Sequence, residues 1–223
     1  MVFRRGSDNI DTFKVIHNRK LSEHTFCLRT ERPDVRIRAG QCFSVGTRDL
    51  GINREYSMYS AAEDDFIDFL IREVPDGIIS PRLASCEPGD LIEIGGPYGD
   101  FCLSEASVHA NTFVFIATGT GIAPFHSFVQ TYPTLRYQIF HGIRNEMEKY
   151  DESHYKEGCY MPSVSQPQAS IAGERLTSQL QITDLDTESL YYLCGNRMMI
   201  TDAIAILRDR GIPGSSIFTE TFF

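Results

Sequence analysis

The amino-acid sequence predicts two domains of different architecture, an N-terminal antiparallel Greek-key β-barrel followed by an α/β domain with a parallel sheet. Three observations predict this. The 223 residues suffice for one or two domains, and 42% of them are apolar, which is enough to bury a sizeable core. Up to residue 101, apolar stretches are short and separated by turn residues. After residue 111, strand-like runs alternate with helical patterns.

Six short strands are predicted in the first domain, because each is rich in apolar or β-branched residues and is bounded by Gly, Pro or Asp. They cover residues 13–19, 24–29, 41–46, 54–60, 66–74 and 91–94. Several short strands at this spacing are typical of a small antiparallel barrel. Residues 78–85 are expected to form one short helix that closes it.

The second domain is predicted from strands that alternate with helices, which implies a parallel sheet covered by helices. The expected strands are residues 112–117, 135–141, 159–164 and 190–194. Three helices are expected. The first follows the strand at residues 112–117 and ends at about residue 130, the second lies near Tyr150, and the third covers residues 197–210. We place the domain boundary within residues 102–110, with domains 1–103 and 104–223.

Composition excludes several classes of function. A net charge of −9 disfavours nonspecific nucleic-acid binding. No uninterrupted apolar run of about 18 residues and no signal peptide is visible, so we expect a cytoplasmic protein without a membrane segment. The six cysteines are too widely spaced for the usual zinc or iron–sulfur ligand sets, so reduced thiols are expected, with no intrinsic iron–sulfur cluster and no metal.

Charge is unevenly distributed along the chain. Residues 1–54 contain 11 Lys and Arg against 6 Asp and Glu, a net charge of +5, whereas the remaining residues carry −14. Two interpretations stay open. The asymmetry is either a chance property of a solvated surface or a positive face for an acidic protein partner.

A phosphate-binding loop is indicated by Thr118, Gly119, Thr120 and Gly121, which follow a predicted strand and lead into a helix. Glycines at such a turn let backbone N–H groups approach a pyrophosphate, and the positive helix end favours the anion. Pro124 stands where the third glycine of the six-residue dinucleotide fingerprint would be. A tight strand–helix connection is the alternative interpretation of the loop taken alone.

Two further motifs lie in the first domain. On a strand, Arg54 and Tyr56 share one face and Ser57 lies on the other, and a cation beside an aromatic ring suits a phosphorylated, aromatic ligand. The turn Gly77-Ile78-Ile79-Ser80 offers backbone amides and a hydroxyl at the start of a helix, a second anion site. An ordinary exposed strand and a plain helix N-cap are the alternatives.

Taken in order, these motifs resemble those of the ferredoxin–NADP⁺ reductase superfamily, specifically its compact bacterial members. The resemblance adds Gly96-Pro-Tyr-Gly-Asp-Phe101 at the domain junction, Cys194-Gly195-Asn196 at a strand end and the acidic-then-aromatic tail Thr219-Glu-Thr-Phe-Phe223. It runs from about residue 11 to the C-terminus. It implies a flavin-binding barrel, a nucleotide-binding α/β domain and an active site between them.

The resemblance also implies roles for individual residues. Arg54 would pair with the flavin phosphate, Tyr56 would stack on the isoalloxazine, and Ser57 would lie near its N5. Ile71 and the turn formed by Gly77, Ile78, Ile79 and Ser80 would complete the flavin site; a pyrophosphate there favours FAD over FMN.

On the nucleotide side, the resemblance places Thr118, Gly119, Thr120, Gly121 and Pro124 at the nicotinamide nucleotide. Cys194 would pack near the reacting carbon, beside Gly195 and Asn196, and Glu220 and Ser57 would orient the site. Phe222 would cover the nicotinamide position and Phe223 would lie near the adenine. Simple packing of a C-terminal strand is the alternative for the two phenylalanines, and a buried thiol is the alternative for Cys194.

The choice of nucleotide is where this sequence departs from the pattern. NADP-using bacterial members usually carry Ser/Thr-Arg after the third α/β strand, but this chain has Ser165-Gln166. Arg144 and Arg175 do match other basic positions of the family. We therefore expect NADP(H) over NAD(H).

The predicted function is hydride transfer between NAD(P)H and FAD, with single electrons passing between FAD and ferredoxin or flavodoxin. A reductase component of an oxygenase, or an NAD(P)H:flavin reductase, is the alternative on the same fold. A binding module that keeps the fold without the chemistry, or a plain structural protein, is disfavoured because Arg54, Ser57 and the glycine loop are all present.

Overall fold

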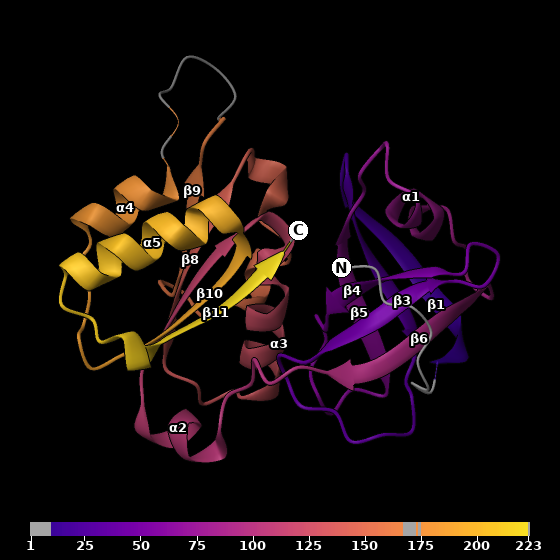
Figure 1. Ribbon diagram of the computed structural model, residues 1–223, viewed down its shortest axis with the longest axis horizontal. Helices are drawn as coiled ribbons and strands as arrows, with labels where there is room; N and C mark the ends of the chain where they lie inside the picture. The colour runs from indigo at the N-terminus through magenta and orange to yellow at the C-terminus, as the bar shows by residue number, and fades with distance from the viewer. Residues whose placement is uncertain (1–9, 167–172, 174, 223) are drawn as a thin grey trace. The chain divides into compact units, whose positions relative to one another are not determined.

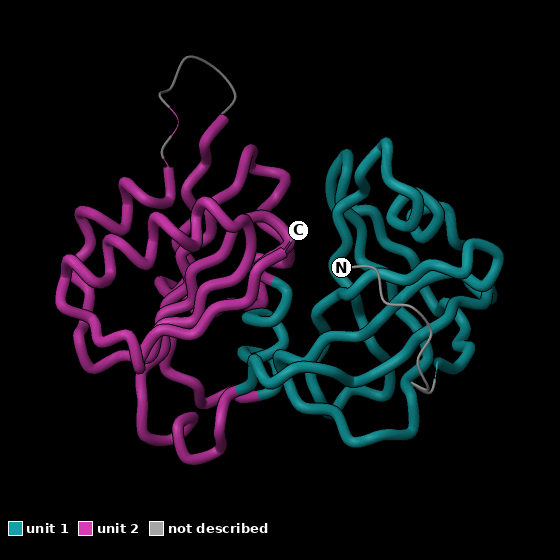
Figure 2. The backbone as a smooth tube through the Cα atoms, in the orientation of Figure 1, with its two compact units in different colours: residues 1–102, 123–131 teal, residues 103–122, 132–223 magenta. Residues whose placement is uncertain are grey.

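A computed structural model describes residues 10–166, 173 and 175–222 of the chain. The chain forms two compact units (Figure 2). Unit 1 comprises Met1–Cys102 and Ala123–Thr131, and unit 2 comprises Leu103–Ile122 and Tyr132–Phe223. Each unit has its own sheet and is described separately.

Unit 1 is an antiparallel barrel of six strands in Greek-key order. The strands are β1 (Ile10–Ser22), β2 (Thr25–Glu31), β3 (Cys42–Thr47), β4 (Ile52–Ser57), β5 (Phe66–Arg72) and β6 (Leu91–Tyr98). Their order is β4-β3-β6-β1-β2-β5, and every neighbouring pair is antiparallel. An isolated antiparallel bridge pairs Met58, the residue directly after β4, with Phe69 of β5. The short helix α1 (Ile79–Ala84) follows β5.

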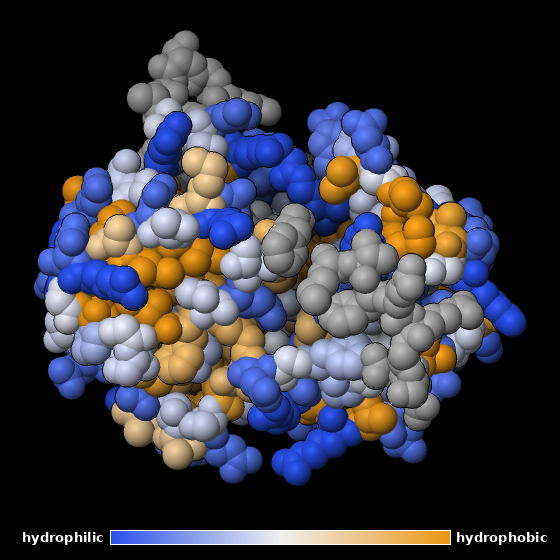
Figure 3. All heavy atoms as spheres, in the orientation of Figure 1, coloured by the Kyte–Doolittle hydropathy of each residue, from blue (hydrophilic) through white to orange (hydrophobic). Residues whose placement is uncertain are grey.

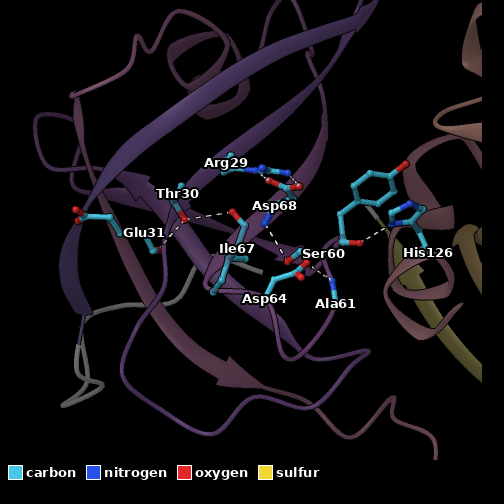
Figure 4. Close-up of polar contacts among 10 residues, drawn as sticks. Arg29, Thr30, Glu31, Ser60, Ala61, Asp64, Ile67, Asp68 and His126 are labelled. Carbon is cyan, nitrogen blue, oxygen red and sulfur yellow. Dashed lines mark hydrogen bonds and ion pairs between the residues drawn. The ribbon is translucent and has the colours of Figure 1, made fainter. Parts of the chain in front are cut away.

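Polar contacts hold the segment after β4 against β5 in unit 1 (Figure 4). Arg29 on β2 grips Asp68 on β5 with two hydrogen bonds of 2.8 Å, and its guanidinium lies 3.5 Å above the ring of Phe66. The Asp68 backbone N–H donates to the Ser60 hydroxyl (3.1 Å). A bidentate, partly buried pair of this kind fixes side-chain geometry more firmly than an exposed ion pair does.

Helix α3 (Ala123–Thr131) packs with the barrel in unit 1, although it follows the glycine loop in the chain. The His126 ring stacks on Tyr59 at 3.8 Å between centroids, and its Nδ1 lies 2.6 Å from the Tyr59 carbonyl oxygen (Figure 4). The Ala62 N–H donates to the Thr131 hydroxyl (2.9 Å). The predicted domain division at residues 103 and 104 assigned this helix to the second domain, whereas these contacts lie with the first.

Unit 2 is a five-stranded parallel sheet in the order β11-β10-β7-β8-β9. Its strands are β7 (Phe113–Thr118), β8 (Tyr137–Ile143), β9 (Tyr160–Val164), β10 (Leu190–Asn196) and β11 (Ile217–Phe222). Its helices are α2 (Glu105–Ala110), α4 (Leu176–Ile182) and α5 (Arg197–Asp209). Figure 1 shows α4 and α5 side by side over one face of the sheet.

Apolar side chains of α4 and α5 bury that face. Leu180, Ala203 and Leu207 are fully buried against Ile116 and Leu193 of the central strands. On the surface drawn in Figure 3, hydrophobic residues gather over α5 and β11, among charged neighbours. Across the described part of the chain, no helix is long and apolar enough to cross a membrane.

The predicted elements are confirmed in type, with one exception and three omissions. The helix expected near Tyr150 is instead two 3-10 turns, Glu146–Glu148 and Glu152–His154, separated where Asp151 adopts a left-handed conformation (φ 47°) that ends a helix. Helices α2 and α4 and strand β11 were not among the predicted elements. All three are short and carry weak periodicity, six or seven residues each.

Candidate active site

Strand β4 presents the first predicted motif in unit 1. Arg54 is exposed, and its guanidinium donates only to the neighbouring carbonyl of Asn53 among the contacts in the described chain (3.1 Å). Tyr56 is half-buried on the same face. Burial raises the pKa of its hydroxyl to about 12, although the positive charge of Arg54 lowers that pKa in part. Ser57 is buried, with 3% of its surface exposed. The strand therefore offers a cation and a neutral aromatic ring together, with the hydroxyl directed inward.

The turn before α1 is closed by the hydroxyl of Ser80. The Val74 N–H donates to Ser80 Oγ (3.0 Å), and the Gly77 N–H donates to the Val74 carbonyl (2.8 Å). A plain helix N-cap was the alternative interpretation of this turn, but Ser80 is the second residue of α1, and Ile78, the position before the helix, makes no side-chain cap. The N-cap alternative is not what the structure shows, because the Ser80 hydroxyl accepts from the turn instead, and the anion site stays a prediction.

The predicted anion site depends on the backbone amides at the start of α1. The first N–H groups of a helix have no partner within it, and here they belong to Ile79 and Ser80, both of which are buried residues. Ile78 is 57% exposed beside them, whereas Ile71 on β5 is fully buried. The turn thus combines fixed amides with an exposed apolar side chain.

In unit 2, the glycine loop forms a 3-10 turn (Gly119–Ile122) directly after β7. The two glycines serve different purposes. A Cβ on Gly121 would lie 2.5 Å from the Cys194 carbonyl oxygen and 2.7 Å from Gly195 Cα, so this glycine permits close packing of two backbones. Gly119 has φ +52°, and a Cβ there would meet nothing within 4 Å. Of these two glycines, Gly119 is the one with open space beside it.

The loop is tied to the end of β10. The Asn196 N–H donates to Thr118 Oγ1 (2.9 Å), and Gly195 (φ +131°) lies against Thr118 so closely that a Cβ would be 2.4 Å from that oxygen. The Asn196 side chain accepts from Met198 N–H (2.9 Å) and caps α5. The predicted groups 118–121 and 194–196 are thus brought together. Thr120 is half-buried within the same turn, and Pro124 lies in the first turn of α3, where no N–H donor is needed.

Cys194 and Glu220 are cross-strand neighbours on β10 and β11. The thiol is fully buried, and its Sγ lies 3.8 Å from Glu220 Oε2. Burial first, and the carboxylate second, raises the pKa of this thiol far above its usual value. Cys194 is therefore a neutral thiol that donates to Glu220, and it is no nucleophile.

The residues predicted to choose the nucleotide meet at the carboxyl ends of β8 and β9. The Ser165 N–H and hydroxyl both donate to the Ile143 carbonyl (2.9 and 3.0 Å), and the Gln166 N–H donates to the Arg144 carbonyl (2.8 Å). Gly173 packs against Ser165, and Arg175 follows two residues later at the start of α4. Arg144, Gln166 and Arg175 are all exposed.

The predicted tail residues lie on β11. Phe222 is half-buried and pairs with Asn196 across the parallel strands. Phe223 lies outside the described residues, so its predicted position near the adenine stays a prediction.

Sequence reasoning missed the residues beneath the glycine loop. His141 is fully buried on β8 and contacts the Gly119 carbonyl, and Tyr160 on β9 contacts the other ring nitrogen (2.8 Å each). The sequence signal that was available is a histidine at the end of an apolar strand followed by glycine.

Two family models match the chain. Residues 12–102 match the oxidoreductase FAD-binding domain and residues 115–204 match the oxidoreductase NAD-binding domain. The flavodoxin/ferredoxin–NADP reductase of Escherichia coli is 31% identical over 121 residues, which are 53% of this chain and 49% of the relative. The toluate 1,2-dioxygenase electron transfer component of Pseudomonas putida is 26% identical over 225 residues, 92% of this chain and 65% of the relative. The chain thus spans about half to two thirds of these relatives.

Solved structures show the same fold. A ferredoxin NADP⁺ reductase from Neisseria gonorrhoeae with bound FAD and NADP superposes with a TM-score of 0.81 at 24% identity, covering 96% of this chain and 99% of that one. A cytochrome P450 reductase from Amycolatopsis gives 0.83 at 22% identity, covering 98% and 72%. With both domains matched, the chain belongs to the ferredoxin–NADP⁺ reductase superfamily.

Proposed function

We propose that this chain is an FAD-dependent reductase that exchanges hydride with NADP(H) and single electrons with ferredoxin or flavodoxin. The observation that carries the proposal is the corner of unit 2 where the glycine loop packs on Cys194, Gly195 and Asn196. This corner has open space beside Gly119. The end of β10 is held against the loop by the hydrogen bond from the Asn196 N–H to Thr118 Oγ1. A nicotinamide nucleotide needs both, a cradle for its diphosphate and a rigid surface for its reacting ring.

The residues of unit 1 fit a flavin dinucleotide. Bound FAD would supply the ability to take up a hydride and release its electrons one at a time. For its phosphate, Arg54 is an exposed cation with room to form bidentate contacts, and the amides of Ile79 and Ser80 are at a helix start. Tyr56 supplies a neutral ring for a flat partner. The turn at Ser80 suits a pyrophosphate, so FAD is proposed over FMN.

The nucleotide is proposed to be NADP(H) because two exposed arginines, Arg144 and Arg175, flank the corner that holds Ser165 and Gln166. A 2′-phosphate is bound well by guanidinium groups, and a ribose hydroxyl does not need them. Gln166 contributes an amide where a third arginine would strengthen the site, so discrimination against NAD(H) is expected to be modest.

The acceptor is proposed to be a small acidic electron carrier. Residues 1–54, which lie in unit 1, carry a net charge of +5 on a chain of net charge −9. Complementary charge accelerates the encounter of redox partners and is weakened by salt. A cytoplasmic location is part of the same proposal.

A second function rests on a specific observation. The match to the toluate dioxygenase electron transfer component covers 92% of this chain, and the Amycolatopsis P450 reductase covers 98%. A reductase that serves an oxygenase is therefore the alternative; a free NAD(P)H:flavin reductase is a further one on the same fold. The three differ in whether flavin stays bound and in which acceptor is reduced.

The deciding experiment is a visible spectrum of the purified protein during anaerobic addition of NADPH and, separately, NADH. Reduction of a bound flavin, faster with NADPH, is the expected result. Electron transfer to ferredoxin, flavodoxin, free flavin and a ferredoxin-type oxygenase component is then compared at low and high salt. A protein that binds no added FAD contradicts the proposal, and preference for free flavin favours the alternative.

A further inference from the structure

A line of hydrogen bonds runs from the glycine loop after β7, through β8, to β9 in unit 2. His141 on β8 has no exposed surface. Its Nε2 lies 2.8 Å from the carbonyl oxygen of Gly119, and its Nδ1 lies 2.8 Å from the hydroxyl of Tyr160 on β9. The Tyr160 ring is itself stacked on Tyr155, with centroids 4.8 Å apart. The imidazole is therefore held from both sides.

The partners fix where the proton of the imidazole lies. The Gly119 carbonyl has no proton to give, so Nε2 must carry the hydrogen and donate it. Burial lowers the pKa of His141 to about 4, which leaves the ring neutral with a single N–H at ordinary pH. Nδ1 then accepts from the Tyr160 hydroxyl, whose own pKa is raised by burial so that it keeps its proton.

The position of the Gly119 carbonyl sets the direction of the next amide. A trans peptide is planar, with its C=O and N–H pointing in opposite directions. Because the Gly119 carbonyl points to buried His141, the Thr120 N–H points away from it, out of the core. Thr120 is also among the first residues of the 3-10 turn, whose leading N–H groups have no partner within the turn. The amide is thus directed toward the accessible side of the loop.

A glycine peptide needs such a restraint. Gly119 has φ +52° and no neighbour where a Cβ would be, so sterics alone oppose rotation of the Gly119–Thr120 peptide only weakly. In the rotated form a carbonyl oxygen would face the accessible side, and it would repel a phosphate. The hydrogen bond from His141 favours the orientation that attracts an anion.

We propose that His141 is a positioning residue, which, with its proton held on Nε2 by the Tyr160 hydroxyl, fixes the Gly119–Thr120 peptide so that the Thr120 amide faces the diphosphate of the nicotinamide nucleotide. This inference rests on the proposed function, because it assigns the loop to that diphosphate. His141 touches neither the nucleotide nor the reacting atoms.

The test compares Tyr160→Phe, His141→Phe and His141→Gln with a matched control, Tyr137→Phe. Tyr137 lies at the other end of β8, where its hydroxyl accepts one backbone hydrogen bond from Lys156 (2.8 Å), so its variant loses a comparable contact without reaching the loop. Binding of NADP⁺ and NAD⁺ to the oxidised holoprotein is measured by calorimetry, followed by KM and kcat. Nitrogen-edited NMR of wild-type protein reports the protonated ring nitrogen of His141.

The expected result is Nε2 protonation in the wild type and about tenfold or greater loss of affinity for both nucleotides in His141→Phe, since one hydrogen bond to a charged group is weakened. KM should rise with little change in kcat. His141→Gln, whose amide can donate to Gly119, should recover part of the loss, and Tyr137→Phe should bind as wild type does. Tyr160→Phe, which removes only the hydroxyl oxygen, should weaken nucleotide binding by a smaller factor. This variant keeps the test valid if His141→Phe does not fold.

Protonation on Nδ1 overturns the inference, and so does equal nucleotide affinity in Tyr160→Phe, both His141 variants and the control. If the wild type binds neither nucleotide, the proposed function itself has failed. If the wild type binds and the variants do not differ from it, the nucleotide assignment stands and only the role of His141 is refuted.

Discussion

Two glycines of one loop are expected to respond to the same substitution in opposite ways. In Gly121→Ala, the new Cβ would lie 2.5 Å from the Cys194 carbonyl oxygen and 2.7 Å from Gly195 Cα, both backbone atoms that cannot rotate away. In Gly119→Ala, the new Cβ meets nothing within 4 Å, but the backbone stays at φ +52°, which an L-residue with a side chain adopts at a cost. Gly121→Ala therefore forces a methyl group into a packed site. Gly119→Ala changes only the backbone preference at that position and the open space beside it.

The magnitudes follow from these geometries. Forcing an extra methyl into a packed site costs about 1–3 kcal/mol, so Gly121→Ala should lower the unfolding temperature of unit 2 by roughly 10 °C, at about 4–8 °C per kcal/mol for a domain of this size. A left-handed alanine costs about 1 kcal/mol, which predicts a smaller shift for Gly119→Ala. The methyl of Gly119→Ala instead fills the space proposed for the diphosphate, so nucleotide affinity should fall at least about tenfold.

For each variant, the same preparation is used for two assays: thermal unfolding of the apoprotein and titration of NADP⁺ into the holoprotein. Gly214→Ala is the control, because a Cβ there meets nothing within 4 Å and the residue lies before β11, at the opposite end of that strand from Phe222. An unchanged unfolding temperature in Gly121→Ala refutes the close approach of the two backbones. Unchanged affinity in Gly119→Ala refutes the placement of the nucleotide beside that residue.

Three further outcomes are expected. Arg54→Ala should retain less FAD after gel filtration than Arg36→Ala, which removes an exposed charge from the same unit; equal retention contradicts the phosphate assignment. Cys194 should resist alkylation at pH 8 in the native protein while half-buried Cys159 reacts first, because burial raises the pKa of the Cys194 thiol. Peptide mass spectrometry distinguishes the two labelled cysteines, and rapid labelling of Cys194 would contradict its burial. The pKa of His141 is about 4 in the folded protein against 6.5 in the unfolded chain, so its contribution to stability is complete above pH 6.5 and is lost as pH falls toward 4. Between pH 7.5 and 4.5, the free energy of unfolding of the wild type, measured in urea, should fall by about 2–3 kcal/mol more than that of His141→Gln. Parallel pH curves for the two proteins would contradict this.

The elements with strong patterns could be predicted from the sequence. The apolar run that became β7 and the turn residues between barrel strands carry local signals that tertiary structure did not override. The Greek-key class was predicted but the individual strand pairings were not, because the insertion of β6 between β1 and β3 depends on contacts far apart in the chain. Helix α4 was missed since only two of its residues, Leu176 and Leu180, are buried.

For the proposed site, the sequence supplied candidate residue types, whereas the contacts between residues came from the structure. The glycine motif and Arg54 could be proposed as binding groups because the conformational freedom of glycine and the charge of arginine are properties of the residues themselves. The direction of the Ser80 hydroxyl toward Val74, and the contact of His141 with Gly119, depend on which backbone groups happen to lie nearby in the fold. No spacing in the sequence encodes them.

The placement of helix α3 has a consequence for how this chain can be divided. The chain passes between the two units at three points, after residues 102, 122 and 131, and two of these flank α3. The first 102 residues expressed alone would lack Phe128, whose ring lies against Gly40, and His126, which covers Tyr59. Neither half is a continuous stretch of gene. Truncation after residue 102 would therefore remove these aromatic contacts from the barrel, whereas a cut after residue 131 would take β7 and the glycine loop away from unit 2, so neither point separates the two units.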